Sequence, residues 1–390
     1  MPNGLYAWAD GLSPRRYQLT VRSIGCSDYY SDTPVLYGSP ESAWSYRTKT
    51  REKGAEPIDS LNEREFMDVV RWGMIGCGDV TERKSGPAFY KAPGSALVAV
   101  MGRRAEAVTD YAARHGIARV YTDAQVLIDD PDVDAVYIAT PPDSHHAYSM
   151  QVAAAGKHCC VEKPMALSST QGEEMQQAFD KAGRHLFVSY YRRSLPRFQR
   201  VREWLTQGHI GEVRQLTWSL IKPPSQKDLE QQANWRTDPA VAGGGYFADL
   251  ASHGLDLFQY LLGDIVAVSG FTARQAGLYA AEDAVVASWR FSSGALGMGC
   301  WNFVADRHED RVEIIGSRGR ILFSVFGDEP VRLDAEETVS EYIQHPEHIQ
   351  WYHVLGMNAH IRGERDYAAL AREAVKTDRV MDQILGRAKT

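Results

Sequence analysis

Three residues with acid–base side chains stand at spacings that suit proton transfer to or from a hydroxyl group. Asp249 and His253 are four residues apart, so a helix would place both on one face. A histidine titrates near neutral pH and is a natural proton acceptor for an alcohol. Lys163 follows the run KHCCVE, and a residue beyond the carboxyl end of a parallel strand faces the ligand crevice. An isolated Asp/His pair is more often structural than catalytic, so this chemistry depends on the elements around it.

A glycine-containing junction supplies the second candidate site. Gly76-Cys-Gly78 directly follows the apolar run VVRWGMI, and Asp79 and Val80 open a helical stretch. The first glycine allows a tight turn and the second lets the backbone approach a pyrophosphate, while the helix N-terminus offers unpaired N–H groups. Thr81 stands where a third glycine is usual, so it either crowds the helix or bonds a phosphate. The pattern indicates a dinucleotide site, and a tight turn without a ligand is the alternative.

The end of the second predicted strand bears on which dinucleotide is bound. An NAD enzyme would place Asp or Glu there to bind the ribose 2′-hydroxyl. This chain has Arg103 and Arg104 instead, and no carboxylate before Glu106. Arginines hold a 2′-phosphate through charge and bidentate hydrogen bonds. The sequence therefore favours NADP over NAD, and a solvated basic helix start is the alternative interpretation.

The elements that would position these residues divide the chain into two folded parts. Strands at 69–75, 95–101, 133–140 and 157–162 alternate with helices, which predicts parallel βαβ units in a doubly wound Rossmann sheet. After about residue 190, a strand at 212–221 and a helix at 247–262 precede consecutive strands joined by short turns. We expect an α/β chain: a Rossmann domain over 67–190, then a substrate-binding and oligomerisation domain over 191–390. That second domain is α+β with an open, mostly antiparallel sheet, and its C-terminal helix is free to pack back on the Rossmann domain.

Composition excludes several classes of protein. The chain has 390 residues, 44% of them hydrophobic, and a net charge of -7, so fibrous, fully disordered and basic nucleic-acid-binding proteins are excluded. No apolar run reaches the roughly 18–20 residues that span a bilayer. The five cysteines have irregular spacing and no CxxC pair, which predicts reduced thiols in a cytoplasmic protein without a metal site.

Residues 1–66 lack periodic patterning and are expected to be a poorly ordered extension, or an arm that wraps a partner subunit.

Five motifs in order resemble one known family. They are the GxGxxx junction at 76–81, ATPPDSH at 139–145, AGKHxxxEKP at 155–164, WRxDPxxAGGG at 235–245 and DxxxH at 249–253. Together they resemble the glucose–fructose oxidoreductase, inositol dehydrogenase and rhizopine-catabolism (Gfo/Idh/MocA) family over residues 67–385. The resemblance implies hydride transfer between NAD(P) and a carbinol of a sugar or cyclitol, in a homodimer or homotetramer with no nucleic-acid or membrane partner.

The resemblance also implies roles for individual residues. Lys163 would contact the reacting hydroxyl and relay its proton, His253 would be the general acid/base, and Asp249 would position the substrate. The substrate pocket would also draw on Tyr191 and Arg192. The cofactor contacts implied by the junction and by the resemblance are Gly76, Gly78, Asp79, Val80, Arg103, Arg104, Thr140, Pro141, His145, Glu162, Lys163, Trp235 and Arg236.

Two alternatives stay open at this stage. One is a glycosidase of the same fold that oxidises its sugar transiently and recycles tightly held NAD. The other is a sensor that binds nucleotide and sugar without chemistry, although the presence of Lys163, Asp249 and His253 argues against it. The identity of the sugar, the carbon that reacts, the physiological direction and the oligomeric state do not follow from one sequence.

Overall fold

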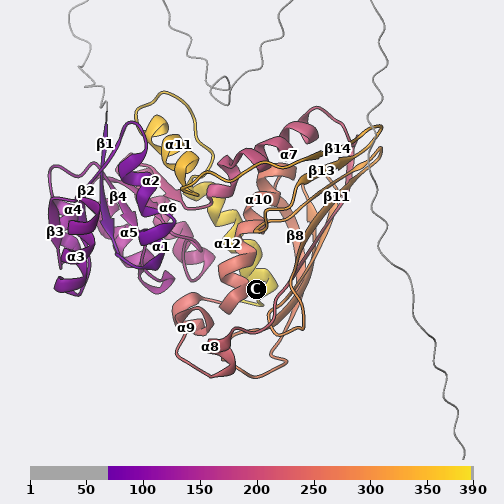
Figure 1. The fold of residues 1–390 in the computed structure, drawn as a ribbon, viewed down its shortest axis with the longest axis horizontal. Helices are drawn as coiled ribbons and strands as arrows, with labels where there is room; N and C mark the ends of the chain where they lie inside the picture. Colours follow the sequence, from indigo (N-terminus) through magenta and orange to yellow (C-terminus); the bar gives the residue numbers. More distant parts are fainter. Residues whose placement is uncertain (1–68, 388–390) are drawn as a thin grey trace, which may run out of the picture. The chain divides into compact units, whose positions relative to one another are not determined.

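The computed structural model describes residues 69–387, and the predicted extension over residues 1–66 lies outside them. The first part of the described chain forms a six-stranded sheet in the order β3-β2-β1-β4-β5-β6, with every neighbouring pair parallel (Figure 1). This is the doubly wound Rossmann sheet that the sequence predicts. Its strands are β1 (Val70–Ile75), β2 (Ser95–Met101), β3 (Arg119–Tyr121), β4 (Ala135–Ile138), β5 (His158–Val161) and β6 (Leu186–Val188).

Helices cover both faces of this sheet, so its strands read as continuous apolar runs. All four residues of β4 are buried, as are all four of β5. One face packs against α2 and α3, and the other against α4, α5 and α6. Gly116 ends α3 with a φ of 67°, as its place after the predicted helix suggests. The helices are α1 (Asp79–Arg83), α2 (Gly86–Lys91), α3 (Ala105–His115), α4 (Ala124–Asp129), α5 (His145–Ala154) and α6 (Ser169–Ala182).

The second part forms an eight-stranded sheet in the order β14-β13-β12-β11-β7-β10-β9-β8. Only β7 and β10 pair in parallel, and all other neighbours are antiparallel, so the predicted α+β class is confirmed. The two short strands β13 and β14 are not among the predicted ones. The strands are β7 (Val213–Ile221), β8 (Ile265–Ala273), β9 (Ala284–Phe291), β10 (Leu296–Asn302), β11 (Glu309–Gly316), β12 (Arg320–Phe323), β13 (Val331–Asp334) and β14 (Thr338–Glu341).

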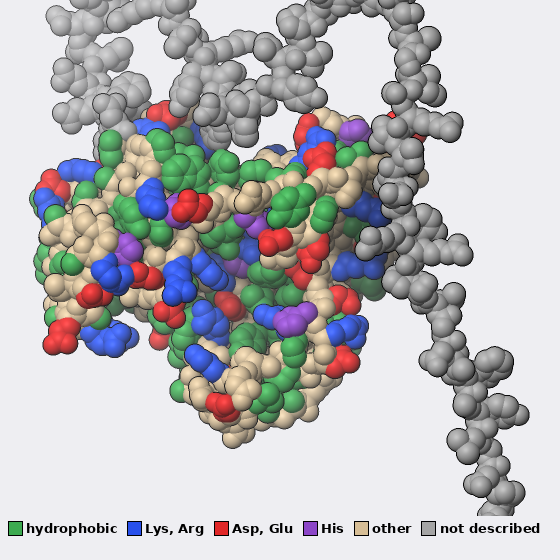
Figure 2. Space-filling model, viewed as in Figure 1, with side chains coloured by type: hydrophobic (Ala, Val, Ile, Leu, Met, Phe, Trp, Pro, Cys, Tyr) green, Lys and Arg blue, Asp and Glu red, His purple; other side chains and the backbone are tan. Residues whose placement is uncertain are grey.

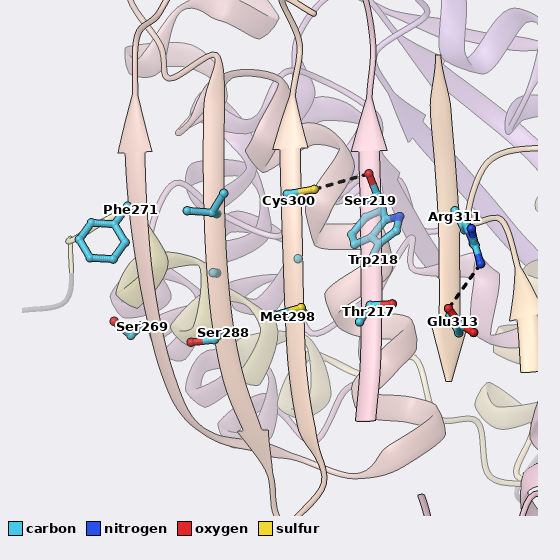
Figure 3. Close-up of a pocket in the computed structure, with 13 residues that line it drawn as sticks. Thr217, Trp218, Ser219, Ser269, Phe271, Ser288, Met298, Cys300, Arg311 and Glu313 are labelled. Atoms are coloured by element: carbon cyan, nitrogen blue, oxygen red, sulfur yellow. Dashed lines mark hydrogen bonds and ion pairs between the residues drawn. The ribbon is translucent and has the colours of Figure 1, made fainter. Parts of the chain in front are cut away.

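Helices pack on one face of this second sheet, and none of the helices within residues 69–387 covers the other face (Figure 1). The alternating burial along β9 and β10 places one set of side chains in the core and the other outside. The outer set includes Phe271, which is 77% exposed, and Met298, which is 51% exposed. Figure 3 shows Phe271 on β8 and Met298 on β10, with Ser288 on the strand between them and Cys300 and Ser219 on β10 and β7.

Two helices near the C-terminus pack on the Rossmann sheet as well. Residues of α11 join the core on the side of α2, and α12 packs between α6 and α10. The Asp382 carboxylate accepts a hydrogen bond of 2.7 Å from the Ser169 backbone N–H at the start of α6. The remaining elements are η2 (Pro142–Ser144), η3 (Tyr191–Ser194), α7 (Pro196–Thr206), α8 (Gln226–Leu229), η4 (Trp235–Thr237), α9 (Pro239–Ala242), a π-helical turn η5 (Phe247–Ala251), α10 (Ser252–Leu262), α11 (Trp351–Ile361) and α12 (Ala371–Ile384).

Candidate active site

The two glycines of the first βα junction have different structural roles. Gly76 has a φ of +102°, and a Cβ there would lie 2.9 Å from the Ala139 carbonyl oxygen, so both its conformation and its surroundings require glycine. A Cβ on Gly78 would meet nothing within 4 Å, so the space beside it is open to a ligand. The Thr81 hydroxyl donates to the Gly78 carbonyl oxygen at 2.9 Å and is buried, so it stabilises the turn and does not reach a phosphate.

A cavity of about 440 Å³ lies at this junction. It brings together six of the predicted cofactor residues from three βα loops, and both arginines among them are exposed. It also has lining residues that the sequence reasoning missed, among them Cys77, Asp143 and Tyr148. Such a crevice at the carboxyl ends of parallel strands suits a dinucleotide. The six predicted residues are Gly76, Gly78, Arg103, Arg104, Thr140 and Pro141.

Other predicted cofactor residues lie outside this lining. Asp79 and Val80 form the first turn of α1, immediately after Gly78. His145 is fully buried, and its two ring nitrogens lie 2.8 Å from the Thr140 carbonyl oxygen and 3.0 Å from the Pro164 carbonyl oxygen. Burial lowers the pKa of His145, and its side chain joins the two loops instead of facing the cavity.

Glu162 is held in place by two uncharged donors. Tyr137 Oη donates to its Oε1 at 2.5 Å, and Gln350 Nε2 donates to the same oxygen at 2.9 Å. Burial, and then the charge of Glu162, raise the pKa of Tyr137 well above its ordinary value. Tyr137 therefore stays a donor, and it fixes the carboxylate that directly precedes Lys163.

Lys163 and Asp249 meet across the boundary between the two sheets. Lys163 follows β5, and Asp249 lies in η5. The Lys163 ammonium lies 2.5 Å from Asp249 Oδ1 and 2.8 Å from the Asp249 carbonyl oxygen. Both side chains are largely buried, at 13% and 16% exposure. The pair therefore fixes the position of one positive charge at the carboxyl end of a Rossmann strand.

A second cation approaches the same carboxylate. Arg236 Nε lies 3.4 Å from Asp249 Oδ2, and its guanidinium stacks on the Trp235 ring at 4.4 Å. Burial alone would raise the pKa of Asp249, but Lys163 and then Arg236 outweigh it, so the pKa lies below its ordinary value. Asp249 is therefore ionised and engaged on both oxygens. Trp235 and Arg236 thus stand beside the catalytic candidates and are absent from the lining of the 440 Å³ cavity.

The first turn of the predicted helix over 247–262 is π-helical, and the α-helix begins only at Ser252. A π-helical turn is wider than an α-helical one, and such turns are frequent at functional sites. The prediction that Asp249 and His253 lie on the same face of a helix assumes that the segment between them is α-helical. In the structure Asp249 pairs with Lys163 and Arg236, and no hydrogen bond joins it to His253 within the described residues.

His253 lies among aromatic rings. Its ring centroid is 5.3 Å from that of Tyr191, 5.9 Å from Phe326 and 6.1 Å from Tyr190. The side chain is 4% exposed, and its Nδ1 has no hydrogen-bond partner between residues 69 and 387. Burial lowers the pKa of His253 well below its ordinary value, and Arg192, Lys163 and Lys84 lower it further. The imidazole is therefore neutral at physiological pH and able to accept a proton.

Two residues near His253 were missed by the sequence reasoning. Lys84 follows α1, and its charge acts on both Asp249 and His253. Phe326 follows β12 and packs on the His253 ring. Neither lies in a motif, and both reach the site only through the fold, so no local signal marks them. Figure 2 shows Lys and Arg side chains gathered on the visible face between the regions of α1 and α9.

A Rossmann sheet with an open glycine turn, together with a Lys163–Asp249 ion pair close to a buried His253, is typical of a nucleotide-dependent oxidoreductase. The chain belongs to the Gfo/Idh/MocA family. Residues 70–190 match the oxidoreductase family with an NAD-binding Rossmann fold, and residues 198–322 match a GFO/IDH/MocA C-terminal domain. The predicted family, enzyme class and use of a nicotinamide dinucleotide are therefore confirmed.

Individual relatives support the same assignment. Oxidoreductase P35 from Formosa agariphila is 34% identical over 81% of this chain and 98% of its own length. A 1,5-anhydro-D-fructose reductase from Ensifer adhaerens is 29% identical over 65% of this chain and 75% of its own. A solved structure of levoglucosan dehydrogenase in complex with NADH and levoglucosan has the same fold, with a TM-score of 0.72 at 22% identity over 82% of this chain and 96% of that one. Between residues 69 and 387, no helix is long and apolar enough to cross a membrane.

Proposed function

We propose that this enzyme transfers a hydride between a nicotinamide dinucleotide and a carbinol or carbonyl carbon of a sugar, cyclitol or derivative. Lys163 and His253 would handle the hydroxyl proton. Two observations at Asp249 carry the proposal. Asp249 Oδ1 lies 2.5 Å from the Lys163 ammonium, and Asp249 stands four residues before His253, which is buried and neutral. A fixed cation and a neutral base on adjacent segments suit alcohol oxidation.

Each group of the cluster has a distinct part in this chemistry. The Lys163 ammonium donates a hydrogen bond to the reacting oxygen and favours its deprotonation. His253 accepts the proton, because burial keeps its imidazole neutral. Asp249 holds Lys163 in place, and the charges of Lys163 and then Arg236 keep the Asp249 carboxylate ionised by lowering its pKa. The nicotinamide supplies the acceptor or donor of the hydride.

The substrate class rests on the relatives and on the polar cluster. The reductase from Ensifer adhaerens acts on an anhydro sugar, as its name states. Tyr191 and Arg192 stand next to His253 and would complete the substrate site, as the sequence predicts. Several hydrogen-bonding groups around one acid–base pair suit a ligand with several hydroxyls.

The cofactor would be held by the loops around the 440 Å³ cavity. The turn at Gly76 and Gly78 would accommodate the pyrophosphate at the start of α1, where the space beside Gly78 is open. The preference for NADP rests on Arg103 and Arg104, which are exposed and line this cavity. Their guanidinium groups would pair with a 2′-phosphate. The family description names NAD, so the preference is our own proposal.

The open face of the second sheet would join two copies of this chain. Phe271, Leu296 and Met298 are each more than half exposed on it. Arg311, which pairs with Glu313 at 3.4 Å, lines the same pocket as Phe271 and Met298 (Figure 3). A large exposed apolar patch marks an interaction surface. Sedimentation of the wild type against Phe271→Glu/Met298→Glu checks this, since we expect a dimer or tetramer that the variant dissociates. A wild-type monomer would rule out the interface.

The cytoplasmic location stays a prediction.

Lys163→Met tests the function. It removes the ammonium and keeps the length of the side chain, so we expect kcat for the oxidation of a sugar or cyclitol to fall by about 10²-fold or more. NADH and NADPH affinities, followed by nicotinamide fluorescence, should stay near those of the wild type. Arg379→Gln, which removes a surface ion pair with Glu173, is the matched control. Retention of most activity by Lys163→Met would overturn the assignment.

A further inference from the structure

Arg192 carries a buried positive charge that has no counter-ion in the described chain. Its residue is 6% exposed, and its Nε donates to the Val325 carbonyl oxygen at 3.0 Å. Its Nη1 is buried and has no hydrogen-bond partner among residues 69–387, and no carboxylate there forms an ion pair with it. An unpaired buried charge is costly unless something else compensates it.

The next residue shows that the fold can satisfy a buried guanidinium. Arg193 is 5% exposed, and both its Nε and its Nη2 donate to the Asp256 carboxylate at 2.7 Å. This bidentate ion pair anchors η3 to α10, so Arg193 has a structural role. Arg192 stands in the same turn at similar burial without such a partner. The difference indicates that the partner of Arg192 comes from outside the described chain.

Arg192 shares its aromatic neighbours with His253. Its guanidinium carbon lies 4.4 Å from the centre of the Phe326 ring and 5.0 Å from that of Tyr191. The His253 ring centroid is 5.9 Å and 5.3 Å from the same two rings. The guanidinium and the imidazole therefore pack against the same two aromatic rings.

The charges that act on His253 are unbalanced. Arg192, Lys163 and Lys84 all act on His253, and every charge that shifts its pKa is positive. The Asp249 carboxylate is already bound by Lys163 and Arg236. Glu162 is bound by Tyr137 and Gln350. The acids of the site are thus engaged, whereas a cation beside the candidate base is not.

We propose that the substrate is an acidic sugar whose carboxylate pairs with Arg192 while its reacting carbinol lies at Lys163 and His253. This inference rests on the proposed function. A carboxylate matches the planar edge of a guanidinium and would accept a hydrogen bond from the unpartnered Nη1 of Arg192. Neutral hydroxyls would compensate the positive charge of Arg192 less well. A sugar phosphate is the other anion that could bind a guanidinium, and the experiment separates the two.

The first experiment uses the wild-type enzyme and needs no variant. Values of kcat/KM are measured for glucuronate, galacturonate and gluconate, for the amide of each, for the parent aldoses and for glucose 6-phosphate. We expect at least one acid to exceed its own amide by about 10-fold or more, because a charged hydrogen bond is lost in the amide. Amides equal to or better than every acid would overturn the proposal, and so would a preference for the phosphate.

Two variants separate recognition of the carboxylate from folding. Arg192→Gln should lower kcat/KM for the preferred acid by about 10- to 100-fold, mainly through KM, and should lower it much less for its amide. Arg192→Lys keeps the charge without the planar fork and should recover part of the loss. Arg379→Gln serves as the control for removal of a surface guanidinium. An equal loss for acid and amide would show a merely structural role and overturn the proposal.

The failure of this inference is distinguishable from that of the proposed function. If neutral sugars react and acids gain nothing, only the acidic-sugar proposal is overturned. If no compound of the panel is oxidised or reduced while NADH or NADPH still binds, the proposed hydride transfer to a sugar is overturned as well.

Discussion

The cofactor cavity is assembled from neighbouring loops of one sheet, whereas the candidate catalytic cluster joins a residue that follows a Rossmann strand to two residues of the helical segment 247–262. Gly76, Arg103 and Thr140 follow three adjacent strands, β1, β2 and β4, and line one cavity. Lys163 follows β5, but its partner Asp249 is 86 residues further along the chain, in the π-helical turn before α10. The first site depends on local backbone geometry, and the second depends on how the two sheets are packed together.

The two sites also differ in how their charges are exposed. Arg103 and Arg104 are exposed at the cavity rim, so salt screens them and they act on a charged ligand from solvent. His253 and Arg192 are 4% and 6% exposed, so desolvation governs their behaviour. If the proposed roles hold, the cofactor site would select its ligand by exposed charge, while the candidate catalytic site would set proton affinity by burial. Predictions that alter one region and spare the other test this separation.

The largest expected effect comes from His253. His253→Asn removes the proton acceptor and should lower kcat for alcohol oxidation by about 10²- to 10⁴-fold, with nucleotide affinity unchanged. In the wild type, burial lowers the pKa of His253, so the histidine stays neutral as the pH falls through about 6.5, the value of an unperturbed histidine. The pH profile of kcat/KM should therefore stay level through that value and decline only at lower pH. A midpoint at or above 6.5 would contradict burial as the dominant influence.

The cofactor loop could be predicted from the sequence because its determinants are local. The strand, the two glycines and the following helix lie within a dozen residues, and each glycine has a backbone reason that a reader of the sequence can state. The parallel, doubly wound class of the Rossmann sheet also follows from alternating strands and helices, but the three-residue strands β3 and β6 were not predicted. The identities of Lys163, Asp249 and His253 as site candidates came from their motifs, and the structure brings Lys163 and Asp249 into contact.

The contacts within the catalytic cluster could not be predicted in the same way. The π-helical turn at 247–251 has no sequence signature, and it accompanies the pairing of Asp249 with Lys163 instead of His253. Gln350 reaches Glu162 across 188 residues of chain, which no spacing rule anticipates. Strands β13 and β14 have only four residues each, so their alternation is too short to separate them from loops. These features arise from tertiary packing.

A smaller effect is expected at the cofactor site, where it concerns the relative affinities for NADPH and NADH. Arg103→Ala/Arg104→Ala should weaken NADPH binding by about 10- to 100-fold and leave NADH binding unchanged, because only NADPH carries the 2′-phosphate. The loss should shrink as salt rises, since exposed charges are screened. Fluorescence titration with both nucleotides at low and high salt measures this. Gly78→Val is the matched control: its side chain enters the open space beside Gly78 and should weaken both nucleotides alike. Equal affinities for NADPH and NADH in the wild type, unaltered in the double variant, would show that the two arginines are only a solvated helix start. Selection by exposed charge would then no longer distinguish the cofactor site from the catalytic one.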